Sequence, residues 1–302
     1  MRVIVHGGAG SSPTAPTERQ GVLDEAADAA SHETEPLDAV ETAVRALERD
    51  ERFNAGRGGA IQSDGRVRVD AGVMTSEREI GAVASLTGVE HPVTVARAVC
   101  EGTPHVLLAG EPGVKFAEHV GVEVGVDLST EATRERFAVA DPPNEASTDD
   151  QLAWVRDRFG DDAGGADPTT DSGDPTTERD HDTVGAVAGD GETFAAATST
   201  GGRWFALAGR VGDVPQVGSG FYCSSAGGAS ATGAGEDIAR ATLARRAVDR
   251  LDAGEDAQTA AEAAIAAFEE ETGSEAGLIV LDGDGVGRAY NSDAMQTAVA
   301  ER

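Results

Sequence analysis

The chain contains few sulfur residues and almost no lysine. Of its 302 residues only Cys100 and Cys223 are cysteines, with no CxxC pair and no His-rich partner motif. This pattern favours a reduced, cytosolic compartment. A single incidental disulfide between the two cysteines is the alternative.

Long apolar runs are also missing. No stretch reaches the length of a membrane-spanning helix, and Met1–His6 enters a strand pattern without the apolar core and cleavage site of a signal peptide. From these absences we expect a soluble, cytoplasmic protein.

Positive charge is scarce. Lys115 is the only lysine, and 24 basic residues face 54 acidic ones, for a formal net charge of −30. Such a surface repels nucleic acid and anionic membranes, so neither is expected as a partner. The charge is typical of a halophilic protein, whose self-repulsion salt would screen, although a protein can also simply be acidic.

The apolar spacing predicts a mixture of strands and helices. With 39% hydrophobic residues the chain can bury the core of one or two domains. The strands come in antiparallel-looking runs and the helices in pairs, which suggests an α+β fold with stacked sheets between helical layers. We expect a tight turn at Gly7–Gly10. The main expected strands are residues 2–6, 79–86, 106–108, 183–188, 194–198, 277–281 and 286–290, and the strand at 106–108 is expected to be buried. The main expected helices are residues 17–32, 36–50, 236–251 and 257–270.

A change of composition separates the two halves. Residues 141–182 are rich in Asp, Gly, Pro and Thr and predict a flexible acidic linker, apart from a short helix at Gln151–Phe159. Long irregular segments are unusual inside a compact domain. A chain that is cut just after this segment would explain it.

The nucleophile that we predict is Thr183. The sequence has no GxSxG elbow and no evident His–carboxylate set to activate a hydroxyl. Cleavage of the Asp182–Thr183 bond would instead give Thr183 a free α-amino group, with an ordinary pKa of about 7.7–8.0, which suits a general base. A threonine before a strand is usually structural, so the surrounding motifs decide the matter.

Those motifs occur in order along most of the chain, and with them it resembles the plant-type (type 2) L-asparaginases and isoaspartyl peptidases, which are N-terminal-nucleophile hydrolases. They are His6-Gly7-Gly8-Ala9-Gly10, Phe53-Asn54-Ala55-Gly56, Asp70-Ala71, Thr183-Val184-Gly185-Ala186-Val187, Ala196-Ala197-Thr198-Ser199-Thr200-Gly201-Gly202, Gly209-Arg210-Val211-Gly212-Asp213 and Thr232-Gly233-Ala234-Gly235-Glu236.

The resemblance implies a role for each matching residue. Thr183 would attack the side-chain amide of asparagine or a β-aspartyl peptide bond. Binding of the substrate's α-carboxylate is implied for Arg210 and of its α-ammonium for Asp213. The remaining implied roles are tuning of the nucleophile by Thr200, an oxyanion hole from the Thr232 hydroxyl and the Gly233 N–H, help in substrate binding from Gly235, and support of the nucleophile by Asn54.

The resemblance also implies an architecture. It predicts one domain over residues 1–302 with a four-layer αββα sandwich, cut into an α chain of residues 1–182 and a β chain of residues 183–302 that pair as a dimer of αβ units. No catalytic metal or organic cofactor is implied, but Leu47–Gly56 matches a loop that binds a structural sodium ion.

Two alternatives stay open. The context His181-Asp182-Thr183 also occurs in the glycosylasparaginases, although Gly201-Gly202 follows Thr200 where that branch has Asn-Gly. Val214 and Met74-Thr75-Ser76 depart from the usual family residues and leave substrate preference open. The other alternative is a non-catalytic amino-acid-binding protein that keeps the fold.

Overall fold

The protein folds around two β-sheets. The structure is a computed structural model that describes residues 1–13, 15–143, 147–159 and 183–302. The larger sheet has seven strands in the order β11-β1-β5-β6-β2-β3-β4, and the smaller has four in the order β10-β9-β8-β7. Only the β3–β4 pair is parallel among the paired strands of the two sheets. The α+β class and the two-sheet arrangement predicted from the sequence are therefore confirmed.

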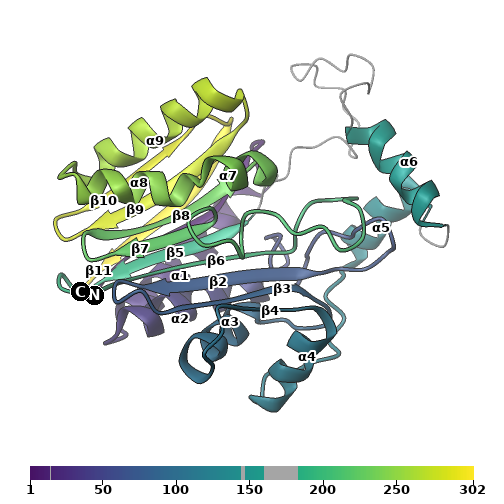
Figure 1. The fold of residues 1–302 in the computed structure, drawn as a ribbon, viewed down its shortest axis with the longest axis horizontal. Helices are drawn as coiled ribbons and strands as arrows, with labels where there is room; N and C mark the ends of the chain where they lie inside the picture. Colours follow the sequence, from purple (N-terminus) through teal and green to yellow (C-terminus); the bar gives the residue numbers. More distant parts are fainter. Residues whose placement is uncertain (14, 144–146, 160–182) are drawn as a thin grey trace.

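The larger sheet brings together strands from both ends of the chain. In spatial order it contains β11 (Ala294–Glu301), β1 (Arg2–Gly10), β5 (Val184–Gly189), β6 (Phe194–Thr200), β2 (Val69–Thr75), β3 (Ile80–Leu86) and β4 (Leu107–Ala109). The helices α1 (Pro16–Ser31), α2 (Pro36–Arg49) and α3 (Pro92–Gly102) pack on its outer face. In Figure 1 the two chain termini lie side by side at one edge.

The smaller sheet comes from the last part of the chain. It contains β10 (Val286–Tyr290), β9 (Ala276–Asp282), β8 (Gly227–Gly233) and β7 (Phe221–Ser224). Its inner face packs on the larger sheet, while α8 (Leu243–Asp252) and α9 (Ala257–Thr272) cover its outer face (Figure 1). The remaining helices are α4 (Gly110–His119), α5 (Glu131–Ala140), α6 (Thr148–Phe159) and α7 (Gly235–Ala241).

Helix α2 shows why these segments fold as they do. Pro36 occupies the first turn, where its missing N–H breaks no hydrogen bond. Apolar residues then recur every three or four positions, so that one face is buried against the larger sheet. The buried apolar residues of this face are Ala39, Val40, Ala43, Val44 and Leu47.

Three local expectations were wrong. The glycines at residues 7–10 do not form a turn: β1 continues through them to Gly10, with an irregularity between His6 and Ala9, because β11 supplies a partner strand. The expected helix 236–251 is interrupted at Thr242, which has a positive φ of 51°. The strand near residue 107 is not buried, since Leu107 is 41% exposed. The strand β11 was not predicted.

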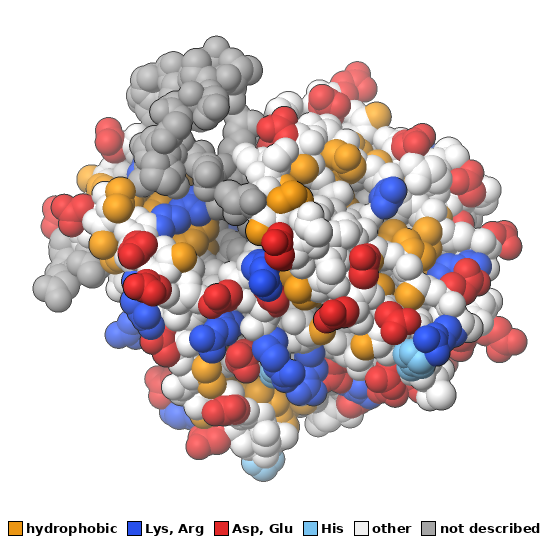
Figure 2. Space-filling view, turned by 180° about the vertical axis from the view of Figure 1, so that it is seen from behind, with side chains coloured by type: hydrophobic (Ala, Val, Ile, Leu, Met, Phe, Trp, Pro, Cys, Tyr) orange, Lys and Arg blue, Asp and Glu red, His pale blue; other side chains and the backbone are white. Residues whose placement is uncertain are grey.

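The outer surface is strongly acidic. Figure 2 shows acidic side chains at many places on one face, with basic ones between them, and the full sequence has a formal net charge of −30. Among the described residues no helix is long and apolar enough to cross a membrane.

Candidate active site

Thr183 lies immediately before β5, in the middle of the larger sheet. The antiparallel register of β5 and β6 pairs Val184 with Ser199, which sets Thr183 opposite Thr200. The Thr183 hydroxyl donates to Oγ1 of Thr200 at 3.1 Å, and Thr183 is only 9% exposed. The strand pairing therefore fixes the two hydroxyls against each other.

The loop after β6 holds Thr200 in place. The Gly202 N–H donates to the Thr200 hydroxyl at 3.0 Å. Asn54 clamps this loop, because its Nδ2 donates to the Gly202 carbonyl at 2.7 Å and its backbone carbonyl accepts from Gly201 N–H at 2.7 Å. Asn54 thus reaches the nucleophile through the Gly201–Gly202 loop and Thr200, and it does not line the pocket.

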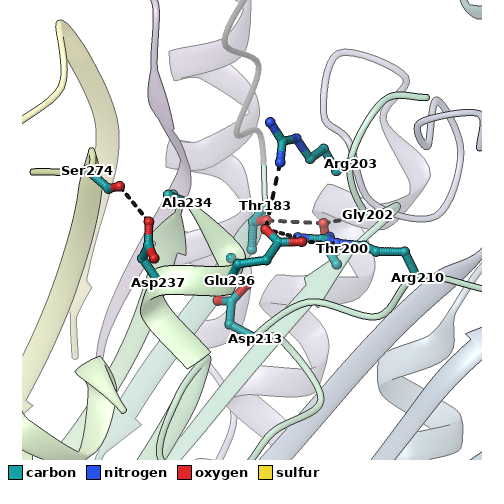
Figure 3. Close-up of a pocket in the computed structure, with 12 residues that line it drawn as sticks. Thr183, Thr200, Gly202, Arg203, Arg210, Asp213, Ala234, Glu236, Asp237 and Ser274 are labelled. Carbon is teal, nitrogen blue, oxygen red and sulfur yellow. Dashed lines mark hydrogen bonds and ion pairs between the residues drawn. The ribbon is translucent and has the colours of Figure 1, made fainter. Parts of the chain in front are cut away.

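A pocket of about 240 Å³ opens above Thr183 (Figure 3). It brings together most of the residues predicted from the sequence, from β5, β6, the loop after β6 and the start of α7. Its lining residues are Thr183, Thr200, Gly202, Arg203, Arg210, Asp213, Gly233, Ala234, Gly235, Glu236, Asp237 and Ser274.

Arg210 is the cation of this pocket that a pair of hydrogen bonds fixes in place. Its Nε and Nη2 donate to the two carboxylate oxygens of Glu236 at 2.8 and 2.9 Å. Burial opposes its charge, but Glu236 outweighs this effect and raises the pKa of Arg210. A guanidinium has a second pair of donors at its Nη1/Nη2 edge, so a bound carboxylate can pair with Arg210 beside Glu236.

Asp213 offers a carboxylate to the same pocket. It is 5% exposed, and within the described ranges its Oδ2 has no hydrogen-bond partner. Burial raises the pKa of Asp213 to about 7, although Arg210 acts in the opposite direction. A buried oxygen without a partner costs free energy, which a bound cationic group would recover.

The glycines near this pair leave room for a ligand. A Cβ on Gly235 would lie 2.7 Å from both Arg210 Nη2 and Asp213 Oδ1, so a side chain here would press on the cation and the anion together. Gly233 lines the pocket and has a φ of 138°. Thr232 is fully buried and does not line the pocket; its hydroxyl accepts from Ala9 N–H at 3.4 Å.

Three buried polar side chains, one histidine and two hydroxyl residues, form a row of contacts near Thr183. His6 Nε2 lies 2.9 Å from Ser230 Oγ, which lies 2.7 Å from Thr198 Oγ1. Burial lowers the pKa of His6 to about 3, an effect that the nearby backbone of Thr183 opposes, so the ring is neutral. These contacts join both sheets, and a Cβ on Gly185 would collide with His6 and Ser230.

Asp70 is a further buried carboxylate beside the site. It pairs across the strands with Thr200, and its Oδ1 accepts from Ser85 N–H at 2.7 Å. Burial raises the pKa of Asp70 to about 7, while Ser85 and the charge of Arg210 act against this. The sequence analysis noted Asp70 in a motif but assigned it no role.

Asp70→Asn should therefore stabilise the protein at alkaline pH. The folded-state pKa lies above the unfolded value of 3.8, so the contribution of Asp70 to stability is present at low pH and is lost as pH rises through about 7. Asn keeps an acceptor for Ser85 without the charge. At pH 8 the variant should have a higher melting temperature than the parent, and its free energy of unfolding should be larger by an amount on the order of a few kcal/mol. Near pH 4 thermal unfolding should show no gain in stability.

Asp64→Asn is a matched control of opposite sign. Burial opposes the charge of Asp64, but Arg68 outweighs this with bonds of 2.7 and 2.8 Å and holds the pKa of the carboxyl below its usual value. Its stabilising effect is present at pH 8 and lost in acid, so this variant should be less stable at pH 8. If both variants changed stability at pH 8 in the same direction, the raised pKa of Asp70 and the lowered pKa of Asp64 would be contradicted.

No cluster of three or more His, Cys, Asp or Glu side chains among the described residues is arranged to hold a metal ion. The loop Leu47–Gly56 instead gathers backbone oxygens. A Cβ on Gly56 would lie 2.4 Å from the carbonyl oxygens of both Glu48 and Glu90, and one on Gly58 would lie 2.7 Å from that of Glu51. Backbone oxygens of this kind suit a hard cation.

A threonine hydroxyl at the start of a central strand, in a fold of two stacked sheets, is the layout of the N-terminal-nucleophile hydrolase fold. The chain belongs to the asparaginase family, whose model, described as "Asparaginase", matches residues 1–302.

Curated relatives agree with this family assignment over nearly their whole length. The chain is 39% identical over 305 residues to a plant-type L-asparaginase of Thermococcus kodakarensis, with 98% of this chain and 95% of the relative covered. It is 39% identical over 307 residues to a plant-type L-asparaginase of Pyrococcus furiosus, with 99% and 95% covered. An isoaspartyl peptidase/L-asparaginase of Danio rerio is 34% identical over 311 residues, with 99% and 92% covered.

Sequence reasoning missed Glu236 and Arg203 as members of the site. Glu236 closes a motif that was recognised, and its place after Gly235 at the start of α7 was the available signal. Arg203 follows Gly201-Gly202, but only the fold shows that this position faces the pocket.

Proposed function

We propose that the protein is a self-processed threonine amidohydrolase that converts L-asparagine to L-aspartate and ammonia and cleaves β-aspartyl dipeptides. The observation that supports it most is that the Thr183 hydroxyl lies in one pocket with a cation and a carboxylate suited to an amino-acid head group. The names of the relatives support the same activity.

Maturation is cleavage of the Asp182–Thr183 bond, of which Asp182 lies outside the described residues. It gives chains of residues 1–182 and 183–302 in one domain of the four-layer αββα type. The new α-amino group of Thr183 then serves as the base for the hydroxyl of the same residue, since its ordinary pKa is close to neutral pH. Residues 144–146 and 160–182 of the predicted linker lie outside the described residues.

Substrate binds through its charged head. Its α-carboxylate pairs with the Nη1/Nη2 edge of Arg210, because Glu236 takes the other edge. Its α-ammonium pairs with Asp213, whose Oδ2 then gains a partner. Gly235 keeps this corner open, and the bound head leaves the side-chain amide over Thr183.

The reaction has two balanced steps. A bond forms between Thr183 Oγ1 and the side-chain carbonyl carbon of the substrate, while the C–N bond of the substrate amide breaks. The hydroxyl proton passes through the α-amine of Thr183 to the departing nitrogen, which leaves as ammonia or as the free amine of an amino acid. Water then hydrolyses the ester and releases aspartate. The oxyanion hole consists of the N–H of Gly233, which lines the pocket, and of the Thr232 hydroxyl, which lies buried directly before it. The Thr200 hydroxyl tunes Thr183.

Three further features complete the proposal. The carbonyl oxygens of the Leu47–Gly56 loop hold a structural sodium ion that takes no part in catalysis. Two αβ units associate as a dimer. The excess of acidic residues is an adaptation to high salt.

The test is to purify the protein in high salt, measure its intact mass and assay it. We expect two fragments, the smaller one beginning at Thr183, and release of aspartate from both L-asparagine and a β-aspartyl dipeptide. An uncut chain after prolonged incubation, or a cut protein that releases aspartate from neither substrate, would overturn the proposal.

A further inference from the structure

Arg203 is a cation of the pocket with no role in the reaction described above. It follows Gly201-Gly202, the loop that holds Thr200, and its side chain is 42% exposed. Figure 3 shows its guanidinium directed toward Glu236, to which a dashed line joins it. Arg203 therefore lines the same pocket as Thr183, the pocket in which the leaving part of a substrate must fit.

The contacts of Arg203 orient its guanidinium without using its hydrogen-bond donors. Its Cζ lies 4.2 Å from the centre of the Phe159 ring, at the end of α6. Its Nη1 lies 3.9 Å from Glu236 Oε2, which is beyond hydrogen-bond distance. Within the described part of the chain this guanidinium makes no hydrogen bond, whereas that of Arg210 donates two to Glu236.

Among the described residues, the charges of the pocket give Arg203 only one carboxylate partner, Glu236, and that partner lies 3.9 Å away. Glu236 pairs with Arg210 at close range and approaches Arg203 only at 3.9 Å. Asparagine brings one carboxylate and one ammonium, which Arg210 and Asp213 match. A β-aspartyl dipeptide brings a second carboxylate, on the residue that leaves.

The length of the dipeptide places this second carboxylate close to Thr183. Its carbon is two bonds beyond the scissile nitrogen, so it lies roughly 4 Å from the carbonyl carbon that Thr183 attacks, given bonds of about 1.3–1.5 Å. A planar guanidinium with free donors is the group best shaped to pair with a carboxylate there.

We propose that Arg203 binds the free α-carboxylate of the residue released from a β-aspartyl dipeptide, and so makes the site selective for dipeptides over longer β-aspartyl peptides or blocked ends. This inference rests on the proposed function of the same pocket. Arg203 determines specificity and takes no part in bond breaking.

The test compares two substrates that differ only at this group, β-aspartyl-leucine and β-aspartyl-leucinamide. In the parent protein kcat/KM should be about tenfold or more higher for the free acid, because only the free acid forms a charged, hydrogen-bonded pair with Arg203, and partial exposure weakens that pair. In Arg203→Gln the ratio of kcat/KM for the free acid to kcat/KM for the amide should be close to one. Arg203→Lys keeps the charge but loses the fork, and it should give an intermediate ratio.

Arg245→Gln is the matched control. Arg245 also lies over an aromatic ring, with its Cζ 5.7 Å from the centre of the Tyr222 ring. Its Nε lies 3.5 Å from Asp249 Oδ2, but Arg245 is on α8 and does not line the pocket. This variant should keep the parental ratio.

The outcomes separate this inference from the proposed function. If the parent cleaves asparagine and both peptides, but the ratio is the same in the parent, Arg203→Gln and Arg203→Lys, the role of Arg203 is wrong and the proposed function stands. If the parent cleaves none of the three, the proposed function fails and this inference fails with it.

Discussion

Thr183→Ala is expected to abolish both self-cleavage and turnover. The substitution removes the hydroxyl that forms the ester in the proposed reaction, and it leaves the hydroxyl of Thr200 without its 3.1 Å partner. Loss of a nucleophile that acts together with its base lowers kcat by about 10⁴-fold or more in comparable hydrolases. Intact mass should show one uncut chain, and aspartate release should fall to background.

Two controls make this result specific. Thr193→Ala removes a threonine hydroxyl from the turn before β6, where it pairs with Asp190 at 3.0 Å, and it should leave cleavage intact. Thr183→Ser keeps the hydroxyl and should keep self-cleavage. If Thr183→Ala gave two fragments or measurable turnover, Thr183 would not be the nucleophile.

Arg210→Ala should have the second largest effect, on substrate binding. The side chain is 16% exposed and makes two charged hydrogen bonds with Glu236. Removing one partner of such a charge pair typically costs about 2–5 kcal/mol, so kcat/KM for asparagine should fall by roughly 30-fold to several thousand-fold. Self-cleavage involves no free amino-acid head, so intact mass should still show two fragments.

The fall in Arg210→Ala has two causes that a double variant separates. The substrate loses its cation, and Glu236 is left as an unpaired anion facing the substrate's α-carboxylate. Adding Glu236→Gln to Arg210→Ala removes the repulsion, so it should recover part but not all of kcat/KM. An Arg210→Ala protein with parental kcat/KM for asparagine would rule out the pocket assignment.

The sequence predicted the elements whose pattern is local. Helix α2 was expected at residues 36–50 and spans Pro36–Arg49, because proline starts it and apolar residues repeat along one face. The hairpin of β9 and β10 was expected at its observed place, since the Asp282–Gly285 turn lies between two apolar runs. Long-range effects were not readable: β1 extends through its glycines only because β11, almost 300 residues away, pairs with it.

The same division holds for the site. The sequence by itself determined the candidate nucleophile Thr183, the pair Arg210 and Asp213, and the family they resemble, because those residues occur in short motifs with glycines at strand ends. The roles of these residues stay predictions.

Only the tertiary structure decided how the charges are shared. Burial raises the pKa values of Asp70 and Asp213, and among the charges that act on Asp213 are those of Glu236 and Asp70, which are distant in sequence. Glu236 takes one edge of Arg210 and leaves Arg203 with free donors, an outcome set by where α7 and the loop after β6 meet. A motif names the side chains, whereas distance and burial fix their charges and partners.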